Sequence, residues 1–340
     1  MPFENFQKYV EDSFSNLKKR HSELSIETLT LMSPKQFIPK EKSNKGVLLI
    51  HGLLDTCASM SSLYDTFSNE GYFVNSILLP GHGTTPEDLL SITYHQWLQC
   101  VKLGLDDLHK HCDDITLVAL SAGATLSLYL AEKYNDINRL VLFAPALELK
   151  PKAAVLIPTL HRFNQRVPLI AKNWLTFQKE EDKTKYQSIT TNSVFQLMSL
   201  IELVNSANKN KIHCPIFMCV SMDDETISSS TAIKFFYKQP NLKNKLCIYT
   251  NDQNNTYNRL NTEIFTSQNL DEKILDYSHV CMHISPKHPL YGNSLTDQTV
   301  HLGAQTAKNK SKYKKNLKRL TYNPHYNVLI EKILTFIKAS

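Results

Sequence analysis

The chain has 340 residues, of which 42% are hydrophobic and 21% charged, enough to bury a sizeable core in one large domain or two smaller ones. No run approaches the roughly twenty apolar residues of a membrane helix, and the N-terminus lacks the apolar core of a secretory signal. The seven cysteines are scattered without framework spacing, so we expect reduced, buried thiols in a soluble, cytoplasmic protein.

The net charge of +6 is local in origin, because residues 308–319 hold seven Lys or Arg and no acid. Such a run is typical of a solvated loop or helix face, and the alternative is a weak contact with an anionic membrane surface. It carries one tyrosine and no series of stacking side chains, which argues against nucleic acid as a partner.

Apolar residues spaced three and four apart between Phe3 and Leu17 predict an amphipathic N-terminal helix within residues 1–25. A strand pair is expected over Glu27–Met32 and Gln36–Pro39. From Lys45 the chain alternates between apolar strand-like runs and helix-like runs. The expected strands are 46–50, 72–79, 115–120 and 139–144, and the expected helices are 58–70, 92–111 and 122–134. This alternation predicts an α/β protein with a mostly parallel, doubly wound sheet covered on both faces.

Residues 147–211 interrupt the alternation with three prolines, an apolar stretch at 153–157 and a helix-like segment at 193–203. We expect an inserted cap or lid whose apolar face forms an acyl pocket, set into a core of residues 26–146 and 212–340. The alternative is ordinary helices packed on the sheet. Farther on, we expect a polar surface insertion at 251–271, an ordered loop at 285–292 and a closing amphipathic helix at 327–337.

Ser121 stands where the strand-like run 115–120 stops and the helix-like run 122–134 begins, with small residues at Ala119 and Gly123. A serine on such a tight turn presents its hydroxyl above the sheet, while the next N–H belongs to a helix N-terminus that favours negative charge. The usual pattern of a nucleophile is Gly-x-Ser-x-Gly, in which Ala119 here replaces the first glycine. The alternative is a serine that only caps the helix.

A serine nucleophile needs a base, an orienting acid and oxyanion donors, and this architecture places the acid and then the histidine after the serine. Asp223 and Asp224 follow the apolar strand 215–220, and His279 lies farther along. Upstream, the strand 46–50 runs into a His-Gly loop whose N–H groups can face an oxyanion.

These motifs together resemble the α/β-hydrolase superfamily, and within it the carboxylesterase and monoacylglycerol-lipase-like branch of the S33 serine aminopeptidase type. The resemblance covers residues from about 45 to 147 and from 212 to 250. The residues that carry it are His51-Gly52, Leu79-Pro-Gly-His-Gly-Thr-Thr-Pro-Glu-Asp-Leu89, Trp97, the turn at Ser121, Phe143-Ala-Pro145, Asp224 and Ser278-His279.

The resemblance implies an α/β-hydrolase fold with Ser121 as nucleophile, His279 as base and Asp224 as the acid that orients it. Asp223 is the rival acid, and Asp224 is favoured because it stands three residues before the apolar Ile227. The implied activity is hydrolysis of small carboxylic esters, either monoacylglycerols or short-to-medium acyl esters. The alternatives are a thioesterase or acyltransferase that uses the same triad, and a non-catalytic ligand-binding protein of this fold.

The backbone N–H groups of Leu53 and Ala122 are the oxyanion donors that the resemblance implies, and no cofactor is needed. His279 and His283 could be spaced as metal ligands on a strand, but no further cluster of acids or cysteines joins them, so no metal is expected. His82 is expected to fix its loop rather than to bind substrate.

Overall fold

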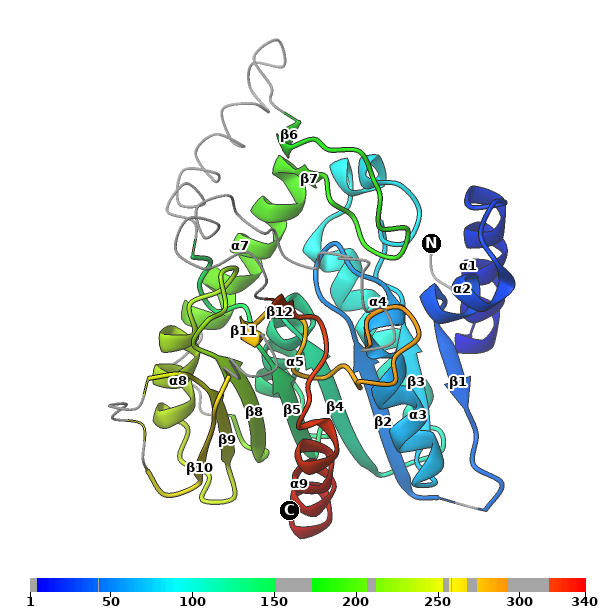
Figure 1. Ribbon diagram of the computed structural model, residues 1–340. Coiled ribbons are helices and arrows are strands. Elements are labelled where there is room, and N and C mark those ends of the chain that lie inside the picture. Colours follow the sequence, from blue (N-terminus) through cyan, green and yellow to red (C-terminus); the bar gives the residue numbers. More distant parts are fainter. Residues whose placement is uncertain are drawn as a thin grey trace.

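The computed structural model describes residues 5–41, 43–150, 173–206, 212–252, 257, 259–267, 274–292 and 318–340. Its centre is an eight-stranded sheet with the strand order β1-β3-β2-β4-β5-β8-β9-β10 (Figure 1). The strands are β1 (Lys35–Phe37), β2 (Lys45–Ile50), β3 (Phe73–Ile77), β4 (Asp114–Leu120), β5 (Arg139–Phe143), β8 (Ile216–Ser221), β9 (Lys245–Tyr249) and β10 (Thr262–Phe265). In this sheet β1 runs antiparallel to β3 and the remaining pairs are parallel.

The helices alternate with the strands along the chain from β2 to β5, as the sequence predicts. They are α1 (Phe6–Arg20), α2 (Ile26–Met32), α3 (Ser61–Asn69), α4 (Tyr94–Leu108), α5 (Ala122–Lys133), α7 (Thr191–Ser206), α8 (Ser229–Lys238) and α9 (Tyr326–Ala339), with short 3₁₀ turns η1 (Cys57–Met60) and η2 (Pro86–Leu90). None of the helices in these described ranges is both long and apolar enough to cross a membrane.

The core lies on both faces of the sheet, because the central strands carry mostly apolar side chains that point alternately to each face. Successive side chains of a strand point to opposite faces. In β2, Leu48 and Ile50 therefore join the cluster formed with α4, α5 and α8, whereas Val47 and Leu49 join the cluster formed with α3 and α9. All four side chains are fully buried, as is typical of a parallel strand between two helical layers.

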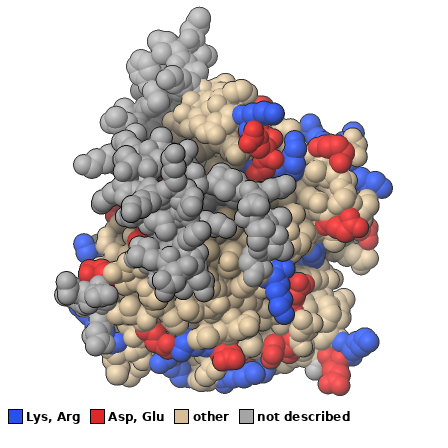
Figure 2. All heavy atoms as spheres, in the orientation of Figure 1, with Lys and Arg blue, Asp and Glu red and all other residues tan. Residues whose placement is uncertain are grey.

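Two short strand pairs stand outside the main sheet. The first is antiparallel and joins β6 (Trp174–Thr176) to β7 (Ile189–Thr190), and the second is parallel and joins β11 (Ile274–Tyr277) to β12 (Lys318–Leu320). Figure 1 shows β6 and β7 at the opposite end of the sheet from α9. Figure 2 shows positive and negative side chains interspersed over the visible face rather than gathered into one patch.

Two sequence-based expectations were wrong in detail. Residues 27–32 belong to the helix α2 and not to a strand, because Ser25 caps the helix by accepting the N–H of Thr28 at 3.2 Å. The segment 251–271 is more than a surface insertion, since β10 extends the main sheet beside β9. The apolar stretch 153–157 and residues 308–317 of the basic run lie outside the described residues.

Candidate active site

Ser121 occupies a sharp turn between β4 and α5. Its backbone has φ 53° and ψ −114°, a left-handed conformation that is costly for a residue with a side chain. The turn is held by the Ser121 N–H, which donates to the carbonyl of Phe143 at 2.9 Å. A Cβ atom at position 123 would lie 2.6 Å from the carbonyl oxygens of both Ile50 and His51, so only glycine fits there. This turn has the strained geometry of a nucleophile elbow.

Asp224 and His279 are brought together from positions 55 residues apart. The Nδ1 atom of His279 lies 2.5 Å from Oδ2 of Asp224, at the end of β8. The other carboxylate oxygen accepts the N–H groups of Thr226 at 2.7 Å and Ile227 at 3.1 Å. These contacts fix the carboxylate so that His279 presents Nδ1–H to it and leaves Nε2 for another partner.

The electrostatics of Asp224 reflect two opposed causes. Complete burial by itself raises the pKa of this carboxyl group, whereas the charge and hydrogen bond of His279 and two backbone N–H groups lower it. The net result is a pKa below the ordinary value of 3.8, so Asp224 is a carboxylate at neutral pH. Asp223, the rival acid, instead accepts a hydrogen bond from Ser267.

The structure does not join Ser121 to His279 directly. Among the described residues, no hydrogen bond links the hydroxyl of Ser121 to the ring of His279. Contacts of this kind are often long in unliganded enzymes and tighten only with substrate. Ser121 directly follows β4, and Asp224, the partner of His279, follows β8, which is separated from β4 by β5. Both Ser121 and His279 therefore lie at the carboxyl edge of the sheet.

The two predicted oxyanion donors flank Ser121. Ala122 is the first residue of α5, so its N–H has no acceptor one turn earlier in the helix. Leu53 follows Gly52, and a Cβ atom added to Gly52 would lie only 3.2 Å from the Cβ of Ser121. The loop that carries Leu53 therefore runs directly beside the serine.

Two histidines and a tryptophan hold the surrounding loops. His51 accepts the N–H of Leu79 at Nε2 (3.0 Å), and burial lowers its pKa to about 4, so its ring is neutral. Burial likewise lowers the pKa of His82 to about 3, and its ring stacks on Tyr186. Trp97 is buried and donates its indole N–H to the carbonyl of Pro80 at 3.1 Å.

Residues 184–186, which precede β7, cross over the loop that follows β2. The N–H of Tyr186 donates to the carbonyl of Leu54 at 2.8 Å, and the hydroxyl of Thr56 donates to the carbonyl of Thr184 at 2.9 Å. The Tyr186 hydroxyl also accepts the N–H of Thr84 at 2.8 Å. Part of the segment inserted between β5 and β8 thus lies against both loops at the carboxyl edge of the sheet.

Sequence reasoning passed over Asp55 and did not assign His283 to the site. Asp55 lies between Leu54 and Thr56, and His283 is completely buried in the turn that follows His279 rather than on a strand. The sequence offered one indication that Asp55 lies near the site, namely its position two residues after Leu53. In the described part of the chain, no group of three or more His, Cys, Asp or Glu side chains is arranged to hold a metal ion.

Comparisons with known proteins agree with this fold. A family model described as serine aminopeptidase, S33, matches residues 41–252. The chain is 32% identical over 194 residues to the thermostable monoacylglycerol lipase of Bacillus sp. (strain H-257), a match that covers 56% of this chain and 75% of that protein. It is 26% identical over 211 residues to the carboxylesterase of Bacillus subtilis (strain 168), covering 60% and 81% of the two chains.

Solved structures share the fold at lower sequence identity. A structure of the metagenome-derived lipolytic enzymes LipS and LipT superposes with a TM-score of 0.60 at 17% identity, covering 91% of this chain and 98% of that one. A monoacylglycerol lipase of Paleococcus ferrophilus superposes with a TM-score of 0.53 at 18% identity, covering 63% and 87%. These matches confirm the predicted α/β-hydrolase fold, and the chain belongs to the serine aminopeptidase S33 family of α/β hydrolases.

Proposed function

We propose that this chain is a serine hydrolase that cleaves small carboxylic esters, with Ser121 as nucleophile, His279 as base and Asp224 as orienting acid. The observation that carries the proposal is the 2.5 Å contact between Asp224 and His279, at the same sheet edge as the strained turn of Ser121. The names of the two bacterial relatives, a monoacylglycerol lipase and a carboxylesterase, support ester substrates. Monoacylglycerols and short-to-medium acyl esters are the leading class.

In the proposed reaction the hydroxyl of Ser121 attacks the ester carbonyl while Nε2 of His279 takes its proton. Asp224 keeps Nδ1–H of the ring in place and stabilises the imidazolium that forms. The oxyanion is held by the N–H groups of Leu53 and Ala122, and losing one such donor costs roughly 100- to 1000-fold in rate. His279 then protonates the leaving alcohol, and water resolves the acyl-enzyme with the same base.

We also propose that residues 147–211 form a cap over the site. Support comes from the described part of this segment, in which residues 184–186 bond to the loop after β2 and α7 packs against α4 and α5. A cytoplasmic location is likewise proposed. All seven cysteines are buried thiols, which suits a reducing compartment.

The test is hydrolysis of p-nitrophenyl esters by the purified protein and by the variant Ser121→Ala. We expect activity to fall on the order of 10⁴-fold or more in the variant, together with loss of fluorophosphonate labelling. The matched control is Ser127→Ala in the helix α5 that Ser121 precedes. Its buried hydroxyl donates to the carbonyl of Gly123 at 2.9 Å, and its loss should leave turnover within a few-fold. Equal activity in Ser121→Ala and the parent protein would refute the assignment.

A further inference from the structure

The residues that follow β5 pair with the loop that carries Asp224. Residues 148–150 run antiparallel to residues 226–228, and Leu149 and Ile227 form the bridge between them. One backbone hydrogen bond on each side of this bridge, of 3.0 and 2.8 Å, joins the two segments. The acid-bearing loop is therefore held by the first residues of the segment inserted between β5 and β8.

Lys150 adds a side-chain contact to this pairing. Its ammonium group donates a hydrogen bond to the backbone carbonyl of Asp224. Asp224 is completely buried, and Lys150 is the one donor that reaches this carbonyl in the described part of the chain. A buried carbonyl that loses its donor raises the free energy of the folded chain. The contact therefore favours the turn in which Asp224 is found.

The other polar groups of Asp224 are also fixed. Its N–H donates to the carbonyl of Ser221 at 3.2 Å, and Oδ1 accepts two backbone N–H groups of the same loop. The remaining carboxylate oxygen, Oδ2, faces His279. Lys150 completes this set at the carbonyl, so the loss of its contact frees the backbone of the residue that must stay aligned with the base. A misplacement of about 1 Å in a catalytic group can cost about 100-fold in rate.

Lys150 itself is exposed, whereas the residue whose carbonyl it contacts is buried. Substitution of an exposed side chain opens no cavity in the core, so the fold should survive the change. Among the described contacts, the ammonium group reaches the carbonyl of Asp224 and no atom of Ser121 or His279. An effect of this side chain on turnover would therefore pass through Asp224.

We propose that Lys150 is a positioning residue, which keeps the carboxylate of Asp224 aligned with His279 through the hydrogen bond to the backbone carbonyl. The inference rests on the proposed function, in which Asp224 orients the base. Loss of the ammonium group should lower kcat and leave KM nearly unchanged, because the contact affects the alignment of the acid and not the binding of the ester.

The experiment measures kcat and KM for a p-nitrophenyl ester in Lys150→Met and Lys150→Arg. In Lys150→Met we expect kcat to fall about 10-fold with KM within about two-fold of the parent value. Lys150→Arg should recover most of the loss, because a guanidinium group can donate to the same carbonyl. The matched control is Lys243→Met, which removes an exposed ammonium group that donates to the carbonyl of Ser340 at 3.4 Å, far from Asp224 at the amino end of the sheet. Its kcat should equal that of the parent.

A double-mutant cycle separates positioning from a general effect on the fold. If Lys150 acts through Asp224, adding Lys150→Met to Asp224→Asn should cost less than about two-fold, because the acid is already lost. The rate of fluorophosphonate labelling gives the same comparison where turnover is too slow to follow. Equal losses in the two backgrounds overturn the inference, as does a parental kcat in Lys150→Met when Ser121→Ala is inactive. If Ser121→Ala is as active as the parent, the proposed function fails and this inference falls with it.

Discussion

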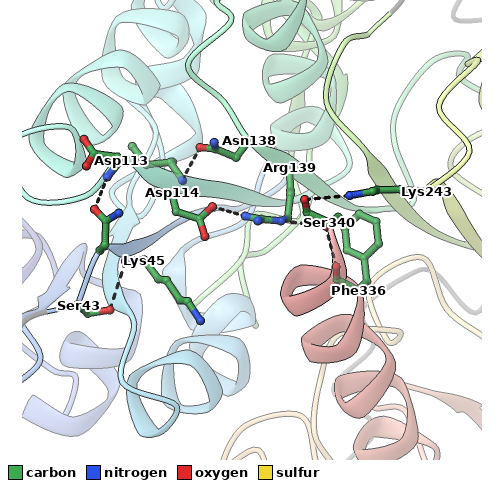
Figure 3. A network of polar contacts seen from close by, with 11 residues as sticks. Ser43, Lys45, Asp113, Asp114, Asn138, Arg139, Lys243, Phe336 and Ser340 are labelled. Atoms are coloured by element: carbon green, nitrogen blue, oxygen red, sulfur yellow. Dashed lines mark hydrogen bonds and ion pairs between the residues drawn. The ribbon is translucent and has the colours of Figure 1, made fainter.

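The two ends of the central sheet differ in what their charged side chains contact. At the amino end, Arg139 at the start of β5 pairs with Asp114 at the start of β4 and donates to the hydroxyl of Ser340 at 2.9 Å (Figure 3). Nearby, the side chain of Asn138 accepts the N–H of Ile115 at 2.7 Å. Each of these groups has a partner inside the protein, so this end contributes stability.

The carboxyl end carries a strained turn and a carboxylate–histidine pair. Ser121 has a positive φ, Asp224 contacts His279 at 2.5 Å, and the buried hydroxyl of Ser278 has no hydrogen bond in the described part of the chain. Crevices at the carboxyl ends of parallel strands are where α/β proteins bind their ligands. Buried polar atoms without a hydrogen bond among the described residues occur at both ends, since Tyr72 Oη and Asn244 Nδ2 lie at the amino end. What distinguishes the carboxyl end is the strained turn of Ser121 and the contact of Asp224 with His279, so substitutions at the two ends should separate effects on stability from effects on chemistry.

The largest expected effect is that of Asp224→Asn at the carboxyl end. The amide cannot hold His279 with Nδ1–H toward it, so kcat should fall on the order of 10⁴-fold. Steady-state kinetics with a p-nitrophenyl ester measure this loss. The neighbouring variant Asp223→Asn is the control, because that acid contacts Ser267 instead. A greater loss in Asp223→Asn would reverse the assignment of the two acids.

The next effect is a dependence of stability on pH. Burial lowers the pKa of His51 to about 4 and of His82 and His283 to about 3, whereas each titrates near 6.5 when unfolded. Below pH 6.5 the unfolded chain therefore binds protons that the folded chain does not, and stability falls as the pH falls. At pH 5.5 we expect a loss of roughly 1 kcal/mol for each of the three histidines.

Urea unfolding between pH 7.5 and 5.5 measures this slope. Burial raises the pKa values of the Asp55 and Asp182 carboxyl groups, and this acts in the opposite sense, because the folded chain then holds protons that the unfolded chain has released. A free energy of unfolding that stays constant over this interval would contradict the buried, neutral state of the histidines.

At the amino end, Arg139→Met should lower stability without changing catalysis. The variant leaves Asp114 without its cation and removes the bond to Ser340. Because the pair is only partly buried, we expect a loss of about 2 kcal/mol, between the values for exposed and fully buried pairs. Chemical denaturation measures it, and kcat should stay within a few-fold of the parent value. A fall of kcat by orders of magnitude would show that the two ends are not independent.

The smallest expected effect is that of Lys102→Met, on the exposed side of α4. Lys102 pairs with Asp106 one turn later at 3.1 Å, and both side chains are about half exposed. Pairs of this kind contribute about 0.3–0.5 kcal/mol. Chemical denaturation under the same conditions compares the free energy of unfolding of this variant with that of Arg139→Met. An equally large loss in both variants would contradict the expectation that a partly buried ion pair contributes more than an exposed one.

The alternation of strands and helices could be predicted because each buried parallel strand leaves a near-continuous apolar run in the sequence. The strand β4 is the clearest example, since it is buried from Ile115 to Leu120 and Ser121 follows at once. Residues 27–32 were misassigned because their apolar and β-branched residues suit a strand, and the cap at Ser25 that favours a helix is a weaker signal.

The site was only partly accessible from sequence. Two adjacent acids follow β8, and nothing local separates them, because the turn that sends Asp224 to His279 and Asp223 to Ser267 forms only in the folded chain. The contacts around Asp55 could not be predicted from the sequence for the same reason. Its neighbours bond to residues about 130 positions later, and a single sequence holds no trace of such a pairing.

The bonds from Leu54 and Thr56 to residues 184–186 have a mechanical consequence. The strip of backbone that carries the proposed oxyanion donor is hydrogen-bonded to part of the inserted segment, so we expect a displacement of that segment here to shift the donor as well. Widening the entrance at this point would pull the donor out of line with Ser121. Substitutions that admit bulkier substrates should therefore disturb catalysis less when they lie elsewhere around the site. Substitutions near Thr184 should change the rate of turnover even though Thr184 does not contact the substrate.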